Sequence, residues 1–171
     1  AEDHAYFQFV GTPTVGPPAP ELEKEDPKKY RDAVAYQAML NSLGDKGVKA
    51  VIMFSQYSDL MGYPGINDPE RKARLHRFVE LMHSQGIKVL VYNGWGITTK
   101  CDEWEAFGTE LVNLPLKNSG YSTYWNSPVS LYPDLFIYRM AEHMREFNLD
   151  GIYMDSTTGI QYSLHPNGMR W

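Results

Sequence analysis

Two segments of the chain share one pattern: a Gly, a β-branched residue, a Lys and then four apolar residues. They are GVKAVIMF at 47–54 and GIKVLVYN at 86–93, 39 positions apart. A short apolar run that begins at a Gly is typical of a strand buried on both faces. The repeat therefore predicts parallel strands that recur along the chain with a helix between them.

Helical patterns lie before these strands. The segment Asn67-Asp68-Pro69-Glu70 offers a capping side chain, a Pro for the first turn and an acid near the positive end of a helix dipole. An earlier helix is predicted to begin in the same way at Asp26-Pro27, and a third to follow Ser127-Pro128 and lead to a strand around Ile152. Their expected apolar stripes are Leu75, Phe78, Val79 and Met82, then Ala33, Tyr36, Leu40 and Leu43, and then Ile137, Met140, Ala141, Met144 and Phe147.

A further strand is expected at Tyr6 to Val10, followed by a Pro-rich connection from Pro13 to Pro20. The order β-α-β-α-β-loop-α-β predicts an α/β fold with parallel pairing through right-handed crossovers. A TIM barrel and an open doubly wound sheet both use this unit. Gly94-Trp95-Gly96 lacks the third Gly of a dinucleotide loop. We therefore favour half of a TIM barrel, with the doubly wound sheet as the alternative.

We expect residues 1–171 to form one partial (β/α) barrel domain with an aromatic-rich insert at 101–127, as a fragment of a longer protein. A net charge of −5 without a run of Lys or Arg argues against nucleic-acid and anionic-membrane partners. The apolar runs are far shorter than the roughly 20 residues that span a bilayer. Cys101 is the single cysteine, and His76 and His83 are seven residues apart, so we expect no metal or other cofactor. His143 lies between charged residues and is expected on an outer helix face.

The stretch LDGIYMDS at 149–156 ends an apolar strand with a carboxylate, Asp155. In barrels of parallel strands, ligands bind at the carboxyl ends of the strands, so this position favours a catalytic or ligand-binding role. The alternative is a cap that accepts the backbone N–H groups of Thr157 and Thr158. Aromatic residues make up 13% of the chain, with 12 Tyr and 4 Trp. Their rings suit stacking on sugars, although they could equally fill the core.

Together, GVKAVIMFS, GIKVLVYNGWG and LDGIYMDS resemble the first half of a TIM-barrel glycoside hydrolase. The resemblance is to the broad group that includes α-galactosidase-like enzymes and many uncharacterised bacterial sugar-processing barrels. It implies a carbohydrate substrate and a glycosidase in which Asp155 is the nucleophile or a stabilising carboxylate. Tyr153 stands where those families tend to have a Lys. The resemblance also implies an acid/base carboxylate on a later strand, outside this chain, and, with the non-Met start, favours a periplasmic or secreted protein.

Other residues near strand ends are candidates for binding the substrate. Tyr57 and Asp59 follow the second strand, although Asp59 could also be a turn or capping residue. Asn93 ends the third strand, where its amide could bind a sugar hydroxyl or form a turn. Trp95, between two glycines, could stack on a sugar or pack against a loop. Ser156 adjoins Asp155.

Two functional classes remain open at this point: a carbohydrate-active hydrolase, and a non-catalytic carbohydrate-binding or scaffold barrel. Four strands of a barrel would leave two open edges and an apolar inner face. We therefore expect the rest of the barrel to come from the same parent chain or from a second copy.

Overall fold

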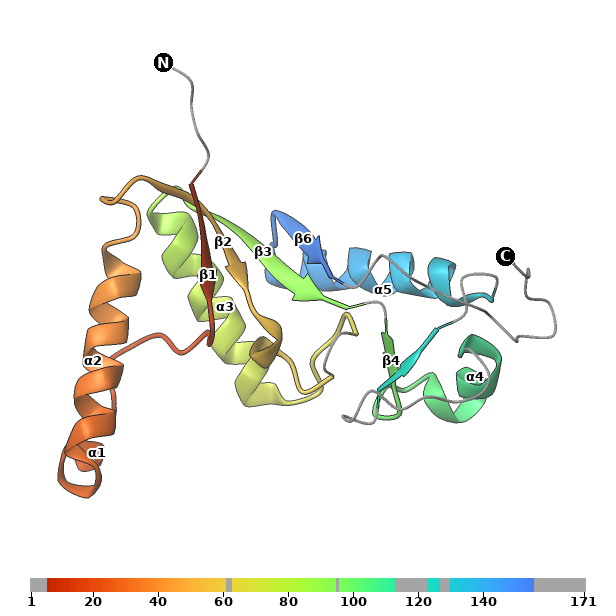
Figure 1. Cartoon of the computed structure of the whole chain (residues 1–171), viewed down its shortest axis with the longest axis horizontal. Helices are drawn as coiled ribbons and strands as arrows, with labels where there is room; N and C mark the ends of the chain where they lie inside the picture. Colours follow the sequence, from red (N-terminus) through yellow and green to blue (C-terminus); the bar gives the residue numbers. More distant parts are fainter. Residues whose placement is uncertain (1–5, 61–62, 95, 113–122, 127–129, 156–171) are drawn as a thin grey trace, which may run out of the picture.

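Four parallel strands form the main sheet of this protein in the computed structural model, which describes residues 6–60, 63–94, 96–112, 123–126 and 130–155. The strands are β1 (Tyr6–Val10), β2 (Val48–Met53), β3 (Lys88–Asn93) and β6 (Gly151–Met154), and they lie side by side in chain order. A doubly wound sheet instead reverses its strand order and carries helices on both faces. The consecutive order matches the barrel prediction (Figure 1).

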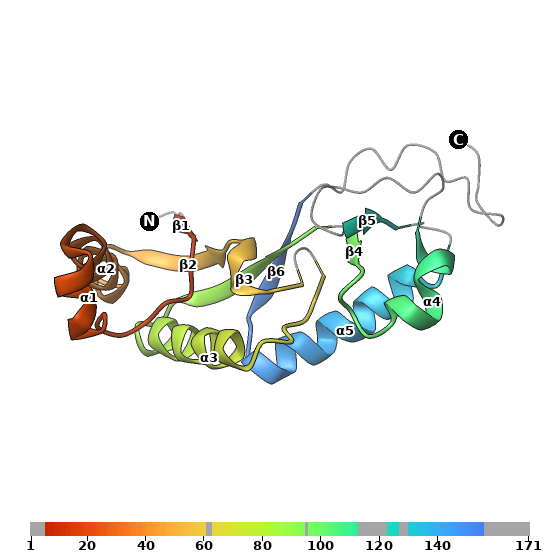
Figure 2. The ribbon, with the colours of Figure 1, turned by 90° about the horizontal axis from the view of Figure 1, so that it is seen from below.

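The helices α2 (Pro27–Asn41), α3 (Pro69–Ser84) and α5 (Tyr132–Phe147) each lead into the next strand of the sheet, and a short helix, α1 (Pro20–Glu25), precedes α2. Figure 2 shows α3 and α5 running beneath the same face of the sheet. The predicted N-terminal caps of α2 and α3 are confirmed. The Asp26 carboxylate accepts a hydrogen bond from the Lys29 N–H, and the Asp68 carboxylate accepts from the N–H groups of Glu70 and Arg71.

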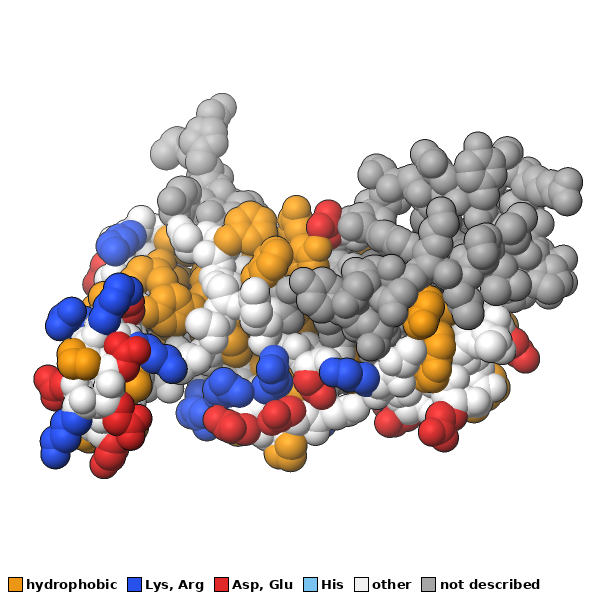
Figure 3. All heavy atoms as spheres, turned by 60° about the horizontal axis from the view of Figure 1, so that its bottom comes forward, with side chains coloured by type: hydrophobic (Ala, Val, Ile, Leu, Met, Phe, Trp, Pro, Cys, Tyr) orange, Lys and Arg blue, Asp and Glu red, His pale blue; other side chains and the backbone are white. Residues whose placement is uncertain are grey.

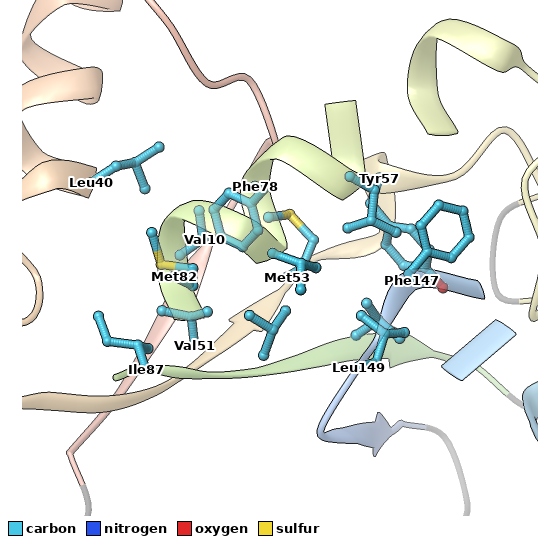
Figure 4. Close-up of a cluster of buried hydrophobic side chains, with 14 of the residues drawn as sticks. Val10, Leu40, Val51, Met53, Tyr57, Phe78, Met82, Ile87, Phe147 and Leu149 are labelled. Carbon is cyan, nitrogen blue, oxygen red and sulfur yellow. The ribbon is translucent and has the colours of Figure 1, made fainter. Parts of the chain in front are cut away.

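The main core lies between the sheet and these helices (Figure 4). The predicted stripe of α3 is fully buried, as are Leu40 in α2 and Leu43 just after it. The predicted stripe of α5 is wrong in part, because Ile137 is 67% exposed and Ala141 is exposed. The side chains that α5 buries are Tyr132, Phe136, Met140, His143 and Phe147. Because His143 occupies one position of the buried stripe, the apolar residues alone predicted a different face of the helix.

The repeated Gly before β2 and β3 has a conformational cause. Gly47 and Gly86 have φ angles of +78° and +70°, in the left-handed region that favours glycine. In the third unit Asn148, with φ of +53°, takes this conformation at the end of α5. Gly86 and Asn148 lie at the ends of α3 and α5, where a left-handed residue ends the helix, whereas Gly47 lies in the turn between the end of α2 and β2.

A smaller unit lies beyond the end of β3 (Figures 1 and 2). Here β4 (Gly96–Thr98) pairs antiparallel with β5 (Thr123–Trp125), next to α4 (Trp104–Leu111). The predicted insert therefore contains a helix and a strand, while residues 113–122 lie outside the described part. A single 3-10 turn, η1 (Ser55–Tyr57), follows β2. In the described ranges, no helix combines the length and apolar character needed to cross a bilayer.

Candidate functional site

Four aromatic side chains share the face of the main sheet that the helices leave uncovered. We call Phe9, Phe54, Tyr92 and Tyr153 the aromatic face. Val10, Met53 and Val91 belong to the core on the helix side. Successive side chains of a strand alternate between its two faces. Phe9, Phe54 and Tyr92, which adjoin these three residues in the chain, therefore point to the opposite side.

The rings of the aromatic face form a connected set. Phe54 and Tyr92 have ring centroids 4.8 Å apart, Tyr92 and Tyr153 are 5.9 Å apart, and Phe9 and Tyr153 are 5.6 Å apart. The last pair joins β1 and β6, the two outer strands of the sheet. In a flat sheet, three strand spacings would keep these side chains about 14 Å apart. The sheet is therefore curved, with the aromatic face on its concave side.

Part of this concave face is open. Phe9 is 53% exposed, Phe54 39% and Tyr153 36%. Figure 3 shows hydrophobic side chains gathered over the strands, whereas the neighbouring helix surface carries Lys, Arg, Asp and Glu. The exposed rings offer flat apolar surfaces on which a ligand could stack.

Asp155 lies at the carboxyl edge of this face, directly after β6. Its backbone N–H donates to the Asn93 carbonyl oxygen at 2.9 Å, which continues the pairing of β3 with β6. The Tyr92 hydroxyl donates to Asp155 Oδ2 at 2.5 Å. Burial, the hydrogen bond to Asp155 and the nearby charge of that carboxylate raise the pKa of Tyr92 to about 12. At neutral pH Tyr92 therefore keeps its proton and acts as the donor.

Tyr57 and Asn93 come together, but away from the aromatic face. Both side chains are buried, and the Tyr57 hydroxyl donates to Asn93 Oδ1 at 3.1 Å. Tyr57 belongs to the core on the helix side, where its ring lies 5.7 Å from that of His143. Burial raises the pKa of Tyr57. This pair ties η1 to the end of β3 and leaves little of either side chain accessible to a ligand.

Asp59 stabilises the loop that leads into α3. Its Oδ1 accepts hydrogen bonds from the N–H groups of Asn67, at 2.9 Å, and Asp68, at 3.4 Å. This is the turn role that the sequence offered as the alternative to binding. Trp95 and Ser156 lie outside the described residues. Asp155 is therefore the predicted site residue that the structure sets beside the aromatic face.

A second polar region lies on the helix side, in a cavity of about 520 Å³ between α3, α5 and the loops around Tyr63 and Glu103. Most of its charges pair with one another. Glu103 accepts from the Tyr63 hydroxyl at 2.9 Å and pairs with Arg139. Elsewhere in the lining, Lys72 pairs with Glu146 at 2.9 Å.

His143 also lines this cavity, and it corrects the prediction of an outer-face histidine. Its side chain is buried, and neither ring nitrogen has a hydrogen-bond partner among the described residues. Burial lowers the pKa of His143 to about 4. Within the same residues, no group of three or more His, Cys, Asp or Glu side chains could hold a metal ion.

The sequence did not identify Phe9, Phe54 and Tyr92 as parts of the site, and it singled out Tyr153 only for its position two residues before Asp155. Alternation along the strands could have assigned their face, because each adjoins a residue that packs against the helices. Their mutual contacts could not be foreseen without the register, in which Tyr92 lies opposite Tyr153.

Comparison with known proteins supports the fold. No protein-family model matches the chain, and no curated protein matches it significantly. Among solved structures, a maltogenic α-amylase from Thermotoga neapolitana has a TM-score of 0.58 and 13% identity, with 90% of this chain covering 39% of that chain. An α-amylase from Geobacillus thermoleovorans has a TM-score of 0.56 and 16% identity, with coverages of 91% and 40%.

A GH36 α-galactosidase from Geobacillus stearothermophilus is also similar, with a TM-score of 0.53, 8% identity and coverages of 68% and 18%. Each of the three proteins is more than twice as long as the part that this chain covers. At such low identities the likeness concerns the fold alone. The chain has an α/β fold of parallel strands like that of part of a TIM barrel, in agreement with the sequence prediction, and the similar structures are glycoside hydrolases.

Proposed function

We propose that this chain contributes to the active site of a glycosidase, with Asp155 as the nucleophile or as a carboxylate that stabilises the transition state. The observation that carries the proposal is the position of Asp155. It follows a parallel strand at the carboxyl edge of a curved sheet and contacts the aromatic face through Tyr92. Ligands of (β/α) barrels bind at this edge, and structures similar to this one are glycoside hydrolases.

The chemistry explains why a carboxylate beside aromatic rings suits this role. Glycoside cleavage passes through an oxocarbenium-like state, which a carboxylate can attack or stabilise while a second carboxyl group protonates the leaving oxygen. Under this proposal the second group comes from a later strand of the completed barrel, supplied by the same parent chain or by a second copy. The aromatic face would stack against the sugar, and Trp95 and Ser156 remain proposed substrate contacts.

Replacement of Asp155 tests the catalytic role. In the protein as its gene encodes it, Asp155→Asn should lower turnover of an activated aryl glycoside by roughly 1000-fold or more, because the amide is a poor nucleophile and carries no charge. Release of the aryl group measures the effect. Asp134→Asn, at an exposed position in the first turn of α5, is the matched control and should retain activity. Full activity of Asp155→Asn would refute the catalytic role.

The exposed rings of the aromatic face favour a second candidate, a non-catalytic carbohydrate-binding barrel. In that case Asp155 would only orient a bound glycan. Calorimetric titration with oligosaccharides distinguishes the two: binding by the wild-type protein without turnover of any aryl glycoside would support the binding barrel.

A further inference from the structure

We infer that Tyr92 is a positioning residue for Asp155, whose hydroxyl fixes one carboxylate oxygen and favours the charged form of the carboxylate. The inference rests on the proposed catalytic role of Asp155. It concerns a residue outside the predicted site, and it depends on contacts between described residues of β3 and β6.

The Tyr92 ring is held by its neighbours on both sides. Since β3 lies between β2 and β6 in the sheet, Phe54 flanks the ring from one side and Tyr153 from the other. The Phe54 ring is tilted at 43° to it, and the Tyr153 ring is stacked at 25°. These contacts restrict the side-chain rotamers and therefore the position of the hydroxyl.

The backbone of Asp155 is also held in place, by a hydrogen bond to β3. Its N–H donates to the carbonyl oxygen of Asn93, so Asp155 continues the pairing of β6 with β3 after the last paired residue, Met154. The two groups are thus brought together by strand register and not by a loop alone. Groups that act in catalysis need such support, because misplacement by about 1 Å can cost roughly 100-fold in rate.

The direction of the hydrogen bond suits a carboxylate nucleophile, because the tyrosine is the donor and the carboxylate is the acceptor. Tyr92 donates its proton to Asp155 Oδ2, and such a bond to the charged form favours that form. With its pKa raised to about 12, Tyr92 does not lose this proton at neutral pH. No proton is consumed or transferred, so Tyr92 orients Asp155 throughout and does not itself react with substrate.

Replacement of Tyr92 by Phe tests this inference, because it removes the hydroxyl and keeps the ring in its packing. We expect kcat for an activated aryl glycoside to fall about 10- to 100-fold, the effect of losing a hydrogen bond to a charged group. KM should change little. The acid limb of the pH profile of kcat/KM should move to higher pH, since the carboxylate loses a donor to its charged form.

Tyr138→Phe is the matched control. The Tyr138 hydroxyl also donates to a carboxylate, Glu142 Oε1 at 2.8 Å, but from the exposed surface of α5. This variant should leave kcat and the acid limb unchanged. A purely structural effect of removing a tyrosine hydroxyl would not shift the acid limb.

Carboxyl-carbon NMR gives a readout that does not depend on turnover. The Asp155 signal should titrate at higher pH in Tyr92→Phe than in the wild-type protein, and at the same pH in Tyr138→Phe. If Asp155→Asn is inactive but neither the acid limb nor the NMR titration moves in Tyr92→Phe, the inference about Tyr92 is overturned and the proposed function stands. If Asp155→Asn is fully active, the catalytic proposal fails, and the positioning role fails with it.

Discussion

His143 is a buried titratable residue on the helix side of the molecule. Its ring contacts those of Tyr57 and Phe147, and the charges of Glu146 and Lys72 act on it. Burial lowers its pKa from an ordinary value of 6.5 to about 4, with Glu146 opposing the shift and Lys72 adding to it. The unfolded chain therefore binds a proton at this residue at a higher pH than the folded protein does.

The sign of the resulting pH effect follows from this difference. As pH falls from about 6.5 to about 4, the unfolded state gains a proton that the folded state does not, and the free energy of unfolding falls. His143→Phe should remove this contribution. Between pH 7 and pH 5 the free energy of unfolding should therefore fall by about 2 kcal/mol less in the variant than in the wild type. Urea unfolding at the two pH values measures it. A loss of stability between the two pH values that is as large in His143→Phe as in the wild type would contradict the prediction.

At the scale of the elements, the left-handed glycines explain why the sequence repeat begins with Gly. Gly86→Ala should lower the free energy of unfolding by about 1–2 kcal/mol, because an Ala at φ of +70° brings its Cβ too close to the backbone. Gly11→Ala is the control. Gly11 has no positive φ, and a Cβ there would meet nothing within 4 Å, so the change should be neutral or slightly stabilising. Thermal unfolding compares the two variants, and equal effects would rule out the conformational explanation.

The elements also show where prediction from sequence succeeds. The caps at Asp26 and Asp68 and the short apolar runs are local signals, and they located α2, α3 and the four strands of the main sheet. The pairing of β4 with β5 could not be predicted, because it joins two three-residue strands that are distant in sequence.

The candidate site was predicted to a smaller extent, for a related reason. Asp155 was found because it follows an apolar strand, which is a local pattern. Asn93 also ends a strand, but its side chain points to the face opposite that of Tyr92. It is therefore buried on the same side as Val91. The bond from Tyr92 to Asp155 depends on the register of β3 and β6, a tertiary property that one strand does not encode.

At the scale of the whole molecule, the contact between Phe9 and Tyr153 joins the outer strands across the concave side. Each of these strands pairs with one neighbour in the described sheet, so each has an edge available for a further strand. Such edges together with exposed aromatic rings promote association between chains. The described sheet therefore resembles part of a barrel wall whose inner surface is exposed.

The 171-residue chain prepared alone should therefore self-associate as its concentration rises, as measured by sedimentation velocity. Phe9→Lys should weaken this association, because it places a charge among the rings of the aromatic face. Ile137→Lys is the matched control. It removes an apolar side chain that is 67% exposed, more than Phe9, but on the outer surface of α5. Equal effects of the two substitutions would mean that general surface hydrophobicity drives the association, and a chain that stays monomeric would show that its concave face needs no partner.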